Sequence, residues 1–249
     1  MIHLQPLPGA PHYSTNLDII RTNMLAEAHA LVEGGVHAIL LENFGDMPFY
    51  RNHVPPHVVA YMTALACDLR RQYKVPLGIN VLRNDGQAAL AIAHAVGADF
   101  IRVNILCGAR ITDQGLIQGI ACDLLRDRCQ IKANTIKIFA DVAVKHSDSL
   151  ADRPLEEEVY DLTQRAGADA VIVSGSATGR SANIQQLKAI KTAARETPVL
   201  VGSGVTAESV ASLKPYSDGF IIGTAFKKNG ITTNPIDPNR VTELMGRLG

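Results

Sequence analysis

Two acidic residues each end a strongly apolar run of this sequence. Glu42 ends the run AILLE, and Asp141 ends the apolar part of IKIFADV. Burying a carboxylate costs free energy unless it is paired or belongs to a site. Two such carboxylates can act as general acid and general base when their surroundings separate their pKa values. His3, which lies in the first apolar run, is the third catalytic candidate.

The same carboxylates have structural and metal-binding alternatives. Either can form an ion pair with Arg102 or Lys145, and the two can instead bind a divalent metal together with His3. Lys145 can also form a Schiff base with a carbonyl substrate if it is desolvated. The sequence places it in a loop beyond the end of its strand, where solvent is the default.

Further polar side chains follow the other apolar runs. Arg102 and Asn104 are two residues apart, so on a strand both point to the same face. We expect such residues to orient a substrate, and the candidates are Asn80, Arg102, Asn104, Lys145 and Ser174. For any one of them, capping of a helix or pairing with a neighbour is the alternative.

Two glycine turns follow the last two apolar runs. They are VLVGSGVT at 199–206 and the central part of FIIGTAFKK at 220–228. Glycines let backbone N–H groups approach an anion, and the loops after the last two strands of many α/β barrels bind phosphate. We therefore predict a phosphate site formed by Gly202, Ser203, Gly204, Gly223 and Thr224. Lys227 or Lys228 can add positive charge to it.

The first turn also fits Gly-x-Gly-x-x-Ala, a pattern of dinucleotide-binding folds. Such folds need an acidic residue about 20 residues further on, at the end of the next strand, whereas Asp218 precedes its strand. The dinucleotide interpretation is therefore rejected, and no cofactor is predicted. The remaining alternative is that these glycines only permit tight turns.

These candidates lie on different apolar runs, so they can form one site only in a fold that brings the ends of many strands together. Apolar runs predict eight strands, at 2–4, 38–41, 77–81, 100–103, 136–142, 170–173, 199–201 and 220–222. Helical patterns alternate with them, at 17–33, 56–73, 86–96, 114–128, 155–166, 183–195, 206–213 and 238–248. Eight strand–helix units in 249 residues predict one domain, 1–249, of the α/β class. We expect a single (β/α)8 TIM barrel with a parallel eight-stranded core, and a doubly wound open sheet is the weaker alternative.

Two long segments between these elements can close over the site. They are 104–115 and 174–183, which carry Arg110 and Arg180. We expect both to be loops that act as lids over a bound anion. Ordinary surface loops are the alternative.

The composition excludes several classes of protein. Hydrophobic residues make up 47% of the chain and charged residues 19%, which is typical of a globular protein. The formal net charge is zero without a basic stripe, so no nucleic-acid partner is predicted. No run approaches the ~20 apolar residues of a membrane span, and no secretory signal is evident, so a cytoplasmic location is expected. The four cysteines form no C-x-x-C pair, which argues against a zinc site or a disulfide framework.

Motifs spread over the whole chain resemble one protein family. In order they are MIHLQPLPGAP, GINVLRND, GADFIRVN, TDQGLIQG, IFADVAVKH, IVSGSATG, VLVGSGVT and NPIDPNRV. Together they resemble the BtpA family, which includes SgcQ-type proteins. The resemblance implies a barrel of the ribulose-phosphate-binding type. It also implies two different roles, because one branch is named for photosystem I biogenesis and the other occurs with genes of sugar uptake and metabolism.

We therefore expect an enzyme that acts on a small phosphorylated metabolite, a sugar phosphate or a phosphoribosyl compound. An isomerase or an aldolase-like lyase fits two carboxylates without an obvious nucleophile. One alternative is a non-catalytic assembly factor that keeps a ligand pocket. Another is a metal-dependent hydrolase that uses His3, Glu42 and Asp141, although Gln5 stands where many such barrels have a second histidine. The sequence leaves a homo-oligomer open.

Overall fold

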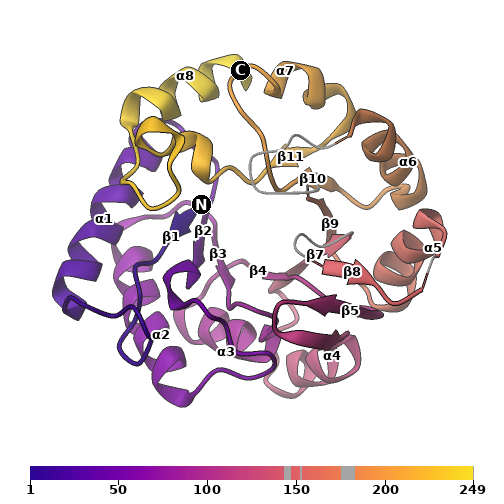
Figure 1. The fold of residues 1–249 in the computed structure, drawn as a ribbon, viewed down its shortest axis with the longest axis horizontal. Coiled ribbons are helices and arrows are strands. Elements are labelled where there is room, and N and C mark those ends of the chain that lie inside the picture. The colour runs from indigo at the N-terminus through magenta and orange to yellow at the C-terminus, as the bar shows by residue number, and fades with distance from the viewer. Residues whose placement is uncertain (143–146, 152, 175–182, 249) are drawn as a thin grey trace.

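Eight strands form one curled parallel sheet at the centre of the molecule (Figure 1). The computed structural model describes residues 1–142, 147–151, 153–174 and 183–248. In the order of the chain and of the sheet, the strands are β1 (Ile2–His3), β2 (Ile39–Glu42), β3 (Leu77–Asn80), β4 (Phe100–Val103), β7 (Lys137–Val142), β9 (Ala170–Val173), β10 (Val199–Val201) and β11 (Gly219–Phe220). Each overlaps one predicted run, so the parallel eight-stranded α/β fold is confirmed.

Burial explains why these runs form strands. Every residue of β2, β3, β4 and β9 is buried, because helices cover one face of the sheet and the other face lines a packed interior. Aromatic rings fill part of that interior. The rings of Phe100 and Phe139 stack with their centroids 4.6 Å apart, and Phe100 occupies the space that Gly78 leaves open.

Helices surround the sheet (Figure 1). They are α1 (Leu17–Glu33), α2 (Pro56–Gln72), α3 (Gly86–Val96), α4 (Ala121–Gln130), α5 (Leu155–Tyr160), α6 (Ile184–Ala194), α7 (Val210–Leu213) and α8 (Pro238–Leu248). The Asn16 side chain caps the start of α1 by accepting a hydrogen bond from the Ile19 N–H at 2.9 Å. Asp85 caps α3 in the same way, and Gly97 ends that helix with a φ of +66°.

The length and hydropathy of these helices bear on membrane insertion. Within the described ranges, no helix is both long enough and apolar enough to cross a membrane.

A hydrogen bond joins the residue before the first strand of the parallel sheet to a residue just after the last strand. The amino group of Met1 donates to the carbonyl oxygen of Ile222 at 2.7 Å. Within the described residues, no strand ladder joins β1 to β11. The sheet is therefore curled, whereas its closure into a single barrel, which the sequence predicts, is not confirmed.

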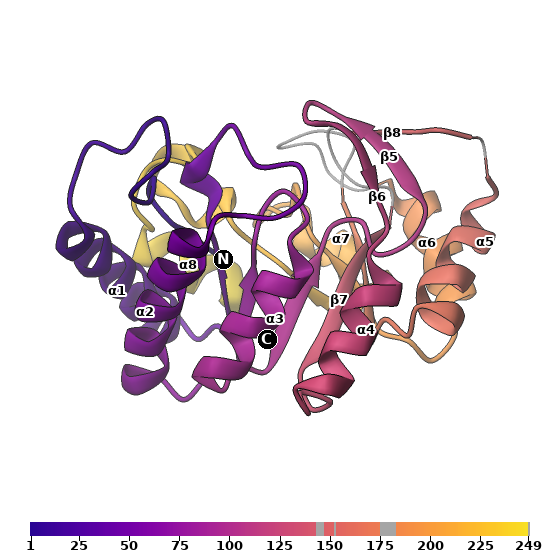
Figure 2. The same ribbon diagram turned by 90° about the horizontal axis from the view of Figure 1, so that it is seen from below.

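A second, antiparallel sheet is the main departure from the predicted fold. Its strands, in order, are β6 (Gly115–Gln118), β5 (Ala109–Thr112) and β8 (Ser147–Ser149). Figure 2 shows this small sheet at the upper edge of the molecule, above α4. The prediction of a loop at 104–115 is therefore wrong. The prediction of a helix from 114 is also wrong, because α4 begins only at Ala121.

The small sheet follows from a short alternation that the sequence analysis overlooked. Ile117 is buried against Ile105, whereas Ile111 and Leu116 are exposed on the other face. Such alternation is typical of strands with one covered face. The other predicted lid, 174–183, lies almost wholly outside the described residues, and so does Arg180.

Three aspartates lie at the end of the parallel sheet where the strands begin. Each stands just before a strand and accepts a hydrogen bond from a backbone N–H of a neighbouring strand, at 2.7–2.9 Å. The donors are Leu77 for Asp99, Ile138 for Asp169 and Val199 for Asp218. Each carboxylate also pairs with a basic side chain, namely Arg70, Lys137 and Lys191 respectively. These aspartates therefore tie neighbouring strands together.

Candidate active site

The carboxyl ends of the parallel strands surround a cavity of about 730 Å³, which is called the large cavity below. Predicted site residues that line it are His3, Glu42, Arg102, Asn104, Asp141, Gly202, Ser203, Gly204, Gly223 and Thr224. Asn80 in β3 and Ser174 after β9 are buried but do not line the cavity. Lys145 lies outside the described residues. The structure thus brings the acid–base candidates and both glycine turns into one cavity.

Four polar side chains form one register row across the first four strands. His3 on β1 is opposite Glu42 on β2, which is opposite Asn80 on β3, and Asn80 is opposite Arg102 on β4. His3 Nε2 lies 3.8 Å from Glu42 Oε1, and Arg102 Nη1 lies 3.9 Å from Glu42 Oε2. Glu42 therefore has a histidine on one side and an arginine on the other.

Asp141 is held by a bidentate ion pair. Arg102 donates from Nε to Oδ1 at 3.0 Å and from Nη2 to Oδ2 at 2.9 Å, and Asn104 Nδ2 donates to Oδ2 at 2.8 Å. Burial alone lowers the pKa of Arg102, but the charge and hydrogen bonds of Asp141, with the charge of Glu42, raise it above its ordinary value. Arg102 therefore stays protonated. The structure shows Asp141 in an ion pair with Arg102, which is one of the alternatives that the sequence left open.

The same arginine bears on the metal-binding alternative. Its guanidinium lies between the carboxylates of Glu42 and Asp141, in the place that a cation shared by both would occupy. In the part of the chain that the structure describes, no group of three His, Cys, Asp or Glu side chains is arranged to hold a metal ion. The residues present therefore do not fit a metal shared by His3, Glu42 and Asp141.

Three buried polar atoms near this network have no hydrogen-bond partner within the described part of the chain. They are Asn80 Oδ1, Asn104 Oδ1 and Ser174 Oγ. The two amides are oriented by their nitrogens, which donate to the Arg102 carbonyl oxygen at 3.1 Å and to Asp141 respectively. A buried polar atom without a partner costs about 1–3 kcal/mol. A ligand that donates a hydrogen bond to Asn104, which lines the cavity, removes one such cost.

The two glycine turns approach two members of the register row, Arg102 and His3. A Cβ atom on Gly202 would stand 2.4 Å from Ile172 Cγ2 and 3.7 Å from Arg102 Nη2. A Cβ atom on Gly223 would stand 2.8 Å from His3 Cε1. Because neither position has room for a side chain, glycine lets the backbone approach the residues of the cavity closely.

Several backbone N–H groups belong to the glycine turns that line the cavity. Gly204 has a φ of +67°, a conformation that glycine adopts readily. Among the described residues, no acceptor is present for the N–H groups of Ser203, Gly204, Gly223 and Thr224. Backbone N–H groups in this arrangement are suited to an anion.

Lys227 does not lie at the predicted phosphate site, so this expectation is wrong. Its side chain is buried, and Nζ donates to Glu27 Oε1 on α1 at 2.6 Å. It lines a second, largely apolar cavity of about 760 Å³, which is bounded by α1 and residues 232–238 and shares His3 and Phe44 with the first cavity. The partner is 200 residues away in the chain, so its pairing is not visible in the sequence. Lys228 is exposed.

Two arginines that the sequence analysis did not select line the large cavity. They are Arg83, which follows β3, and Arg240 on α8. Burial lowers the pKa of Arg83, and the charges of Asp141 and Asp113 oppose this shift. Arg240 donates from Nε to the carbonyl oxygen of Ala225 at 2.7 Å. Arg83 also follows the predicted strand 77–81, as the selected candidates follow theirs, whereas the sequence signal for Arg240 is its place in NPIDPNRV.

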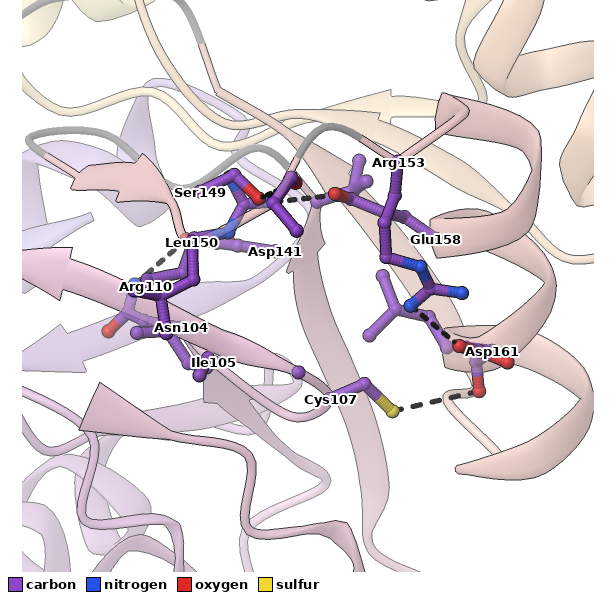
Figure 3. Close-up of a pocket in the computed structure, with 15 residues that line it drawn as sticks. Asn104, Ile105, Cys107, Arg110, Asp141, Ser149, Leu150, Arg153, Glu158 and Asp161 are labelled. Carbon is purple, nitrogen blue, oxygen red and sulfur yellow. Dashed lines mark hydrogen bonds and ion pairs between the residues drawn. The ribbon is translucent and has the colours of Figure 1, made fainter. Parts of the chain in front are cut away.

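A third, smaller pocket, of about 130 Å³, lies beside the three-stranded sheet (Figure 3). Asn104 and Asp141 line both this pocket and the large cavity. Arg110 of β5 also lines it and pairs with Glu158 of α5 at 2.6 Å. The ion pair fastens the small sheet to α5, so Arg110 serves this contact and does not reach over the cavity as a lid residue.

Cys107 lies at the far side of the same pocket, where Sγ contacts the carbonyl oxygen of Asp161 at 3.7 Å (Figure 3). Burial raises the pKa of the Cys107 thiol, and the charge of Asp161 adds to this shift. Arg153, which pairs with the Asp161 carboxylate at 2.9 Å, opposes it only in part. The thiol is therefore protonated at neutral pH and is a poor nucleophile.

Comparison with known proteins now places the chain in a family. The model of the BtpA family matches residues 1–248. The chain belongs to the BtpA family. A relative in Methanocaldococcus jannaschii, an uncharacterized protein, is 43% identical over 98% of this chain and 92% of its own length. The photosystem I biogenesis protein BtpA of Synechocystis sp. is 43% identical over 97% of this chain and 84% of its own length.

Solved structures show a similar fold in more distant proteins. Phosphoribosyl anthranilate isomerase from Thermococcus kodakaraensis matches with a TM-score of 0.58 and 14% sequence identity. The match covers 90% of this chain and 93% of the isomerase. At such low identity the likeness concerns the fold alone, and these neighbours are TIM-barrel proteins.

Proposed function

We propose that this BtpA-family chain is an enzyme that acts on a small phosphorylated metabolite, as an isomerase or an aldolase-like lyase. One observation carries the proposal: both glycine turns line the same cavity as His3, Glu42 and Arg102, and they approach two of these side chains. Gly223 lies against His3, and Gly202 lies against Ile172 and near Arg102. A phosphate held at the turns would place the rest of its molecule beside groups that can transfer protons.

The proposed roles follow from these contacts. The N–H groups of the glycine turns hold the phosphate. Glu42 and His3, 3.8 Å apart, transfer protons as acid and base. Asp141 keeps Arg102 charged and fixed through two hydrogen bonds, and Asn104 accepts a hydrogen bond from a substrate hydroxyl. Asp141 then acts mainly by positioning Arg102, which in turn faces Glu42.

The position of the turns in the fold supports the same assignment. β10 and β11 are the seventh and eighth strands of the parallel sheet, and phosphate sites of TIM barrels are commonly built from the loops after these strands. The proposal takes the sheet as one barrel closed where the Met1 amine meets Ile222. The related fold of phosphoribosyl anthranilate isomerase adds an analogy, which is weaker than the site itself.

A thermal-unfolding screen tests this proposal. The probes are ribose 5-phosphate, pentulose and hexose phosphates, inorganic phosphate, and each sugar without its phosphate. A ligand present at 100 times its Kd adds about 2.7 kcal/mol of stability, which corresponds to a rise in Tm of roughly 5–10 °C in a chain of this length. We expect a rise with phosphorylated sugars and none with the parent sugars. Equal responses to both members of each pair would overturn the phosphate assignment.

A non-catalytic assembly factor is the second candidate. It is favoured by the Synechocystis relative, which is named as a biogenesis protein and is 43% identical. The structure also exposes Ile111 and Leu116, which are opposite each other on β5 and β6. This apolar pair lies outside the large cavity and can contact a partner. An assembly role predicts that a complex survives Glu42→Gln but is lost in Ile111→Asp.

A further inference from the structure

We infer that Arg240 is the cationic ligand of a phosphomonoester bound at the glycine turns, an assignment that rests on the proposed function. The turns themselves offer uncharged N–H groups to an anion that carries close to two negative charges at neutral pH. A guanidinium beside them would supply the charge and the paired donors that such a group prefers.

Its hydrogen bond to the backbone fixes where Arg240 stands. Nε donates to the carbonyl oxygen of Ala225 at 2.7 Å, and Ala225 directly follows Thr224 of the second glycine turn. Both Ala225 and Arg240 line the large cavity together with Ser203 and Gly204 of the first turn. The guanidinium is therefore anchored at the edge of the proposed phosphate site.

The two terminal nitrogen atoms of Arg240, Nη1 and Nη2, are available to bind an anion. Within the described residues, neither Nη1 nor Nη2 donates a hydrogen bond, and no carboxylate lies within ion-pair distance of either. Arg102, in contrast, is occupied by Asp141, and Lys227 is occupied by Glu27. Arg83 lines the same cavity but follows β3, which is not a neighbour of β10 or β11 in the sheet.

One acidic side chain competes with phosphate for Arg240. Glu208 has a lowered pKa, chiefly because it accepts a hydrogen bond from Thr206 and to a smaller degree because Arg247 and Arg240 are nearby. Glu208 is fully exposed, so solvent screens its attraction to Arg240. A phosphate that contacts the guanidinium directly would be preferred over this screened contact.

The assignment also predicts which form of the ligand binds. The two free nitrogens of the guanidinium form a fork that pairs with two oxygens of one phosphate. A phosphomonoester offers those oxygens and gains its second negative charge above about pH 6. Affinity should therefore rise between pH 5 and pH 7, and a phosphodiester should bind more weakly than a monoester.

The experiment compares three variants by titration calorimetry with inorganic phosphate and with ribose 5-phosphate. Arg240→Gln removes the charge, and Arg240→Lys keeps the charge but loses the fork. Arg247→Gln is the matched control, because Arg247 lies on the same helix, is exposed and pairs only with Glu243 within the described residues. Loss of charge-assisted hydrogen bonds at a half-buried site weakens binding by roughly tenfold or more.

The expected order of affinity is wild type equal to Arg247→Gln, then Arg240→Lys, then Arg240→Gln. Wild-type affinity in Arg240→Gln would overturn the inference and leave the proposed function standing. Equal losses in Arg240→Lys and Arg240→Gln would also overturn it, because Arg240 would then only position Ala225. Absence of phosphate binding in the wild type would instead refute the proposed function. The Tm of each variant without ligand shows that it is folded.

Discussion

Acidic side chains lie at both ends of the parallel sheet, and they are satisfied in different ways. Where the strands begin, Asp99, Asp169 and Asp218 accept hydrogen bonds from backbone N–H groups of neighbouring strands. Where the strands end, Glu42 and Asp141 face another side chain, Arg102, in a cavity. A carboxylate that satisfies the backbone serves the fold. A carboxylate that is buried against other ionisable side chains in a cavity is a candidate for chemistry.

The two ends also differ in exposure. The side chains of Asp99 and Asp218 are 51% and 40% exposed, whereas that of Asp141 is 1% exposed. Water therefore screens the pairs at the first end but not the network at the second. We expect substitutions at the first end to cost little stability and no activity, and substitutions at the second end to cost both.

The largest expected effect comes from Arg102→Met. This change leaves Asp141 buried without its counter-ion, which typically costs about 3–5 kcal/mol. At 2–4 °C per kcal/mol for a chain of this size, the Tm should fall by roughly 6–20 °C. Chemical denaturation gives the free energy of unfolding directly.

The matched variant at the other end is Arg70→Met, which removes the partner of the half-exposed Asp99. It should cost about 1 kcal/mol or less. Equal losses of stability in Arg70→Met and Arg102→Met would contradict the distinction between the two ends.

The next effect concerns turnover of the phosphorylated substrate that the ligand screen identifies. Loss of a group that transfers protons slows a reaction by about 10²–10⁴-fold. We expect Glu42→Gln to fall in that range, and Asp141→Asn to lower turnover through the loss of a fixed Arg102. Asp169→Asn, at the other end, should keep full activity. Steady-state kinetics of the three variants measures the contrast, and unchanged turnover in Glu42→Gln would remove the acid–base role.

The sequence predicts the parallel sheet well because its signal is local. Each strand is an apolar run of a few consecutive residues, and most of these residues are buried in the structure. Glu42, Arg102 and the glycine turns, which are selected by their position at strand ends, line one cavity in the structure, whereas Asn80 and Ser174 do not line it. These inferences need only the order of elements and the rule that parallel strands end on the same side.

The sequence fails where the deciding partner is distant in the chain or the pattern is short. Lys227 is next to the second glycine turn in sequence, yet its side chain turns away to Glu27. Arg240 reaches the same turn from α8. In the four-residue strands β5 and β6 the alternation of buried and exposed side chains is too short to be distinguished from a loop. The burial of Ile117 depends on its contact with Ile105, which the sequence does not reveal.

A smaller effect is expected on the free energy of unfolding when a glycine of the cavity and a glycine elsewhere are each replaced by alanine. Gly202→Ala places a Cβ atom 2.4 Å from Ile172 Cγ2, which must shift, and such overpacking costs about 1–3 kcal/mol. Gly246→Ala on α8 is the control, because its Cβ would meet nothing within 4 Å. Alanine should stabilise that helix by roughly 0.5–1 kcal/mol. Opposite signs of the change in unfolding free energy are expected, and a stabilised Gly202→Ala would show that the turn is not tightly packed.

The smallest effect is a pH dependence at the end where the strands begin. Burial raises the pKa of Asp218, but the hydrogen bonds from Lys191 and the Val199 N–H more than offset this, so the net pKa is lowered. A lowered pKa in the folded state stabilises the fold above the unfolded value of about 4, and this contribution is lost as the pH falls through the folded value. Because Asp218 is well exposed, the contribution should be below about 1 kcal/mol.

Asp218→Asn isolates this contribution, because the amide oxygen can still accept the Val199 N–H bond while the charge is removed. The difference in unfolding free energy between wild type and variant should be constant from pH 7 to pH 5 and should shrink below about pH 4. Urea denaturation across this range measures it. A difference that grows as the pH falls would mean that the carboxylate is destabilised in the fold, which would remove Asp218 from the group of aspartates that tie the strands together.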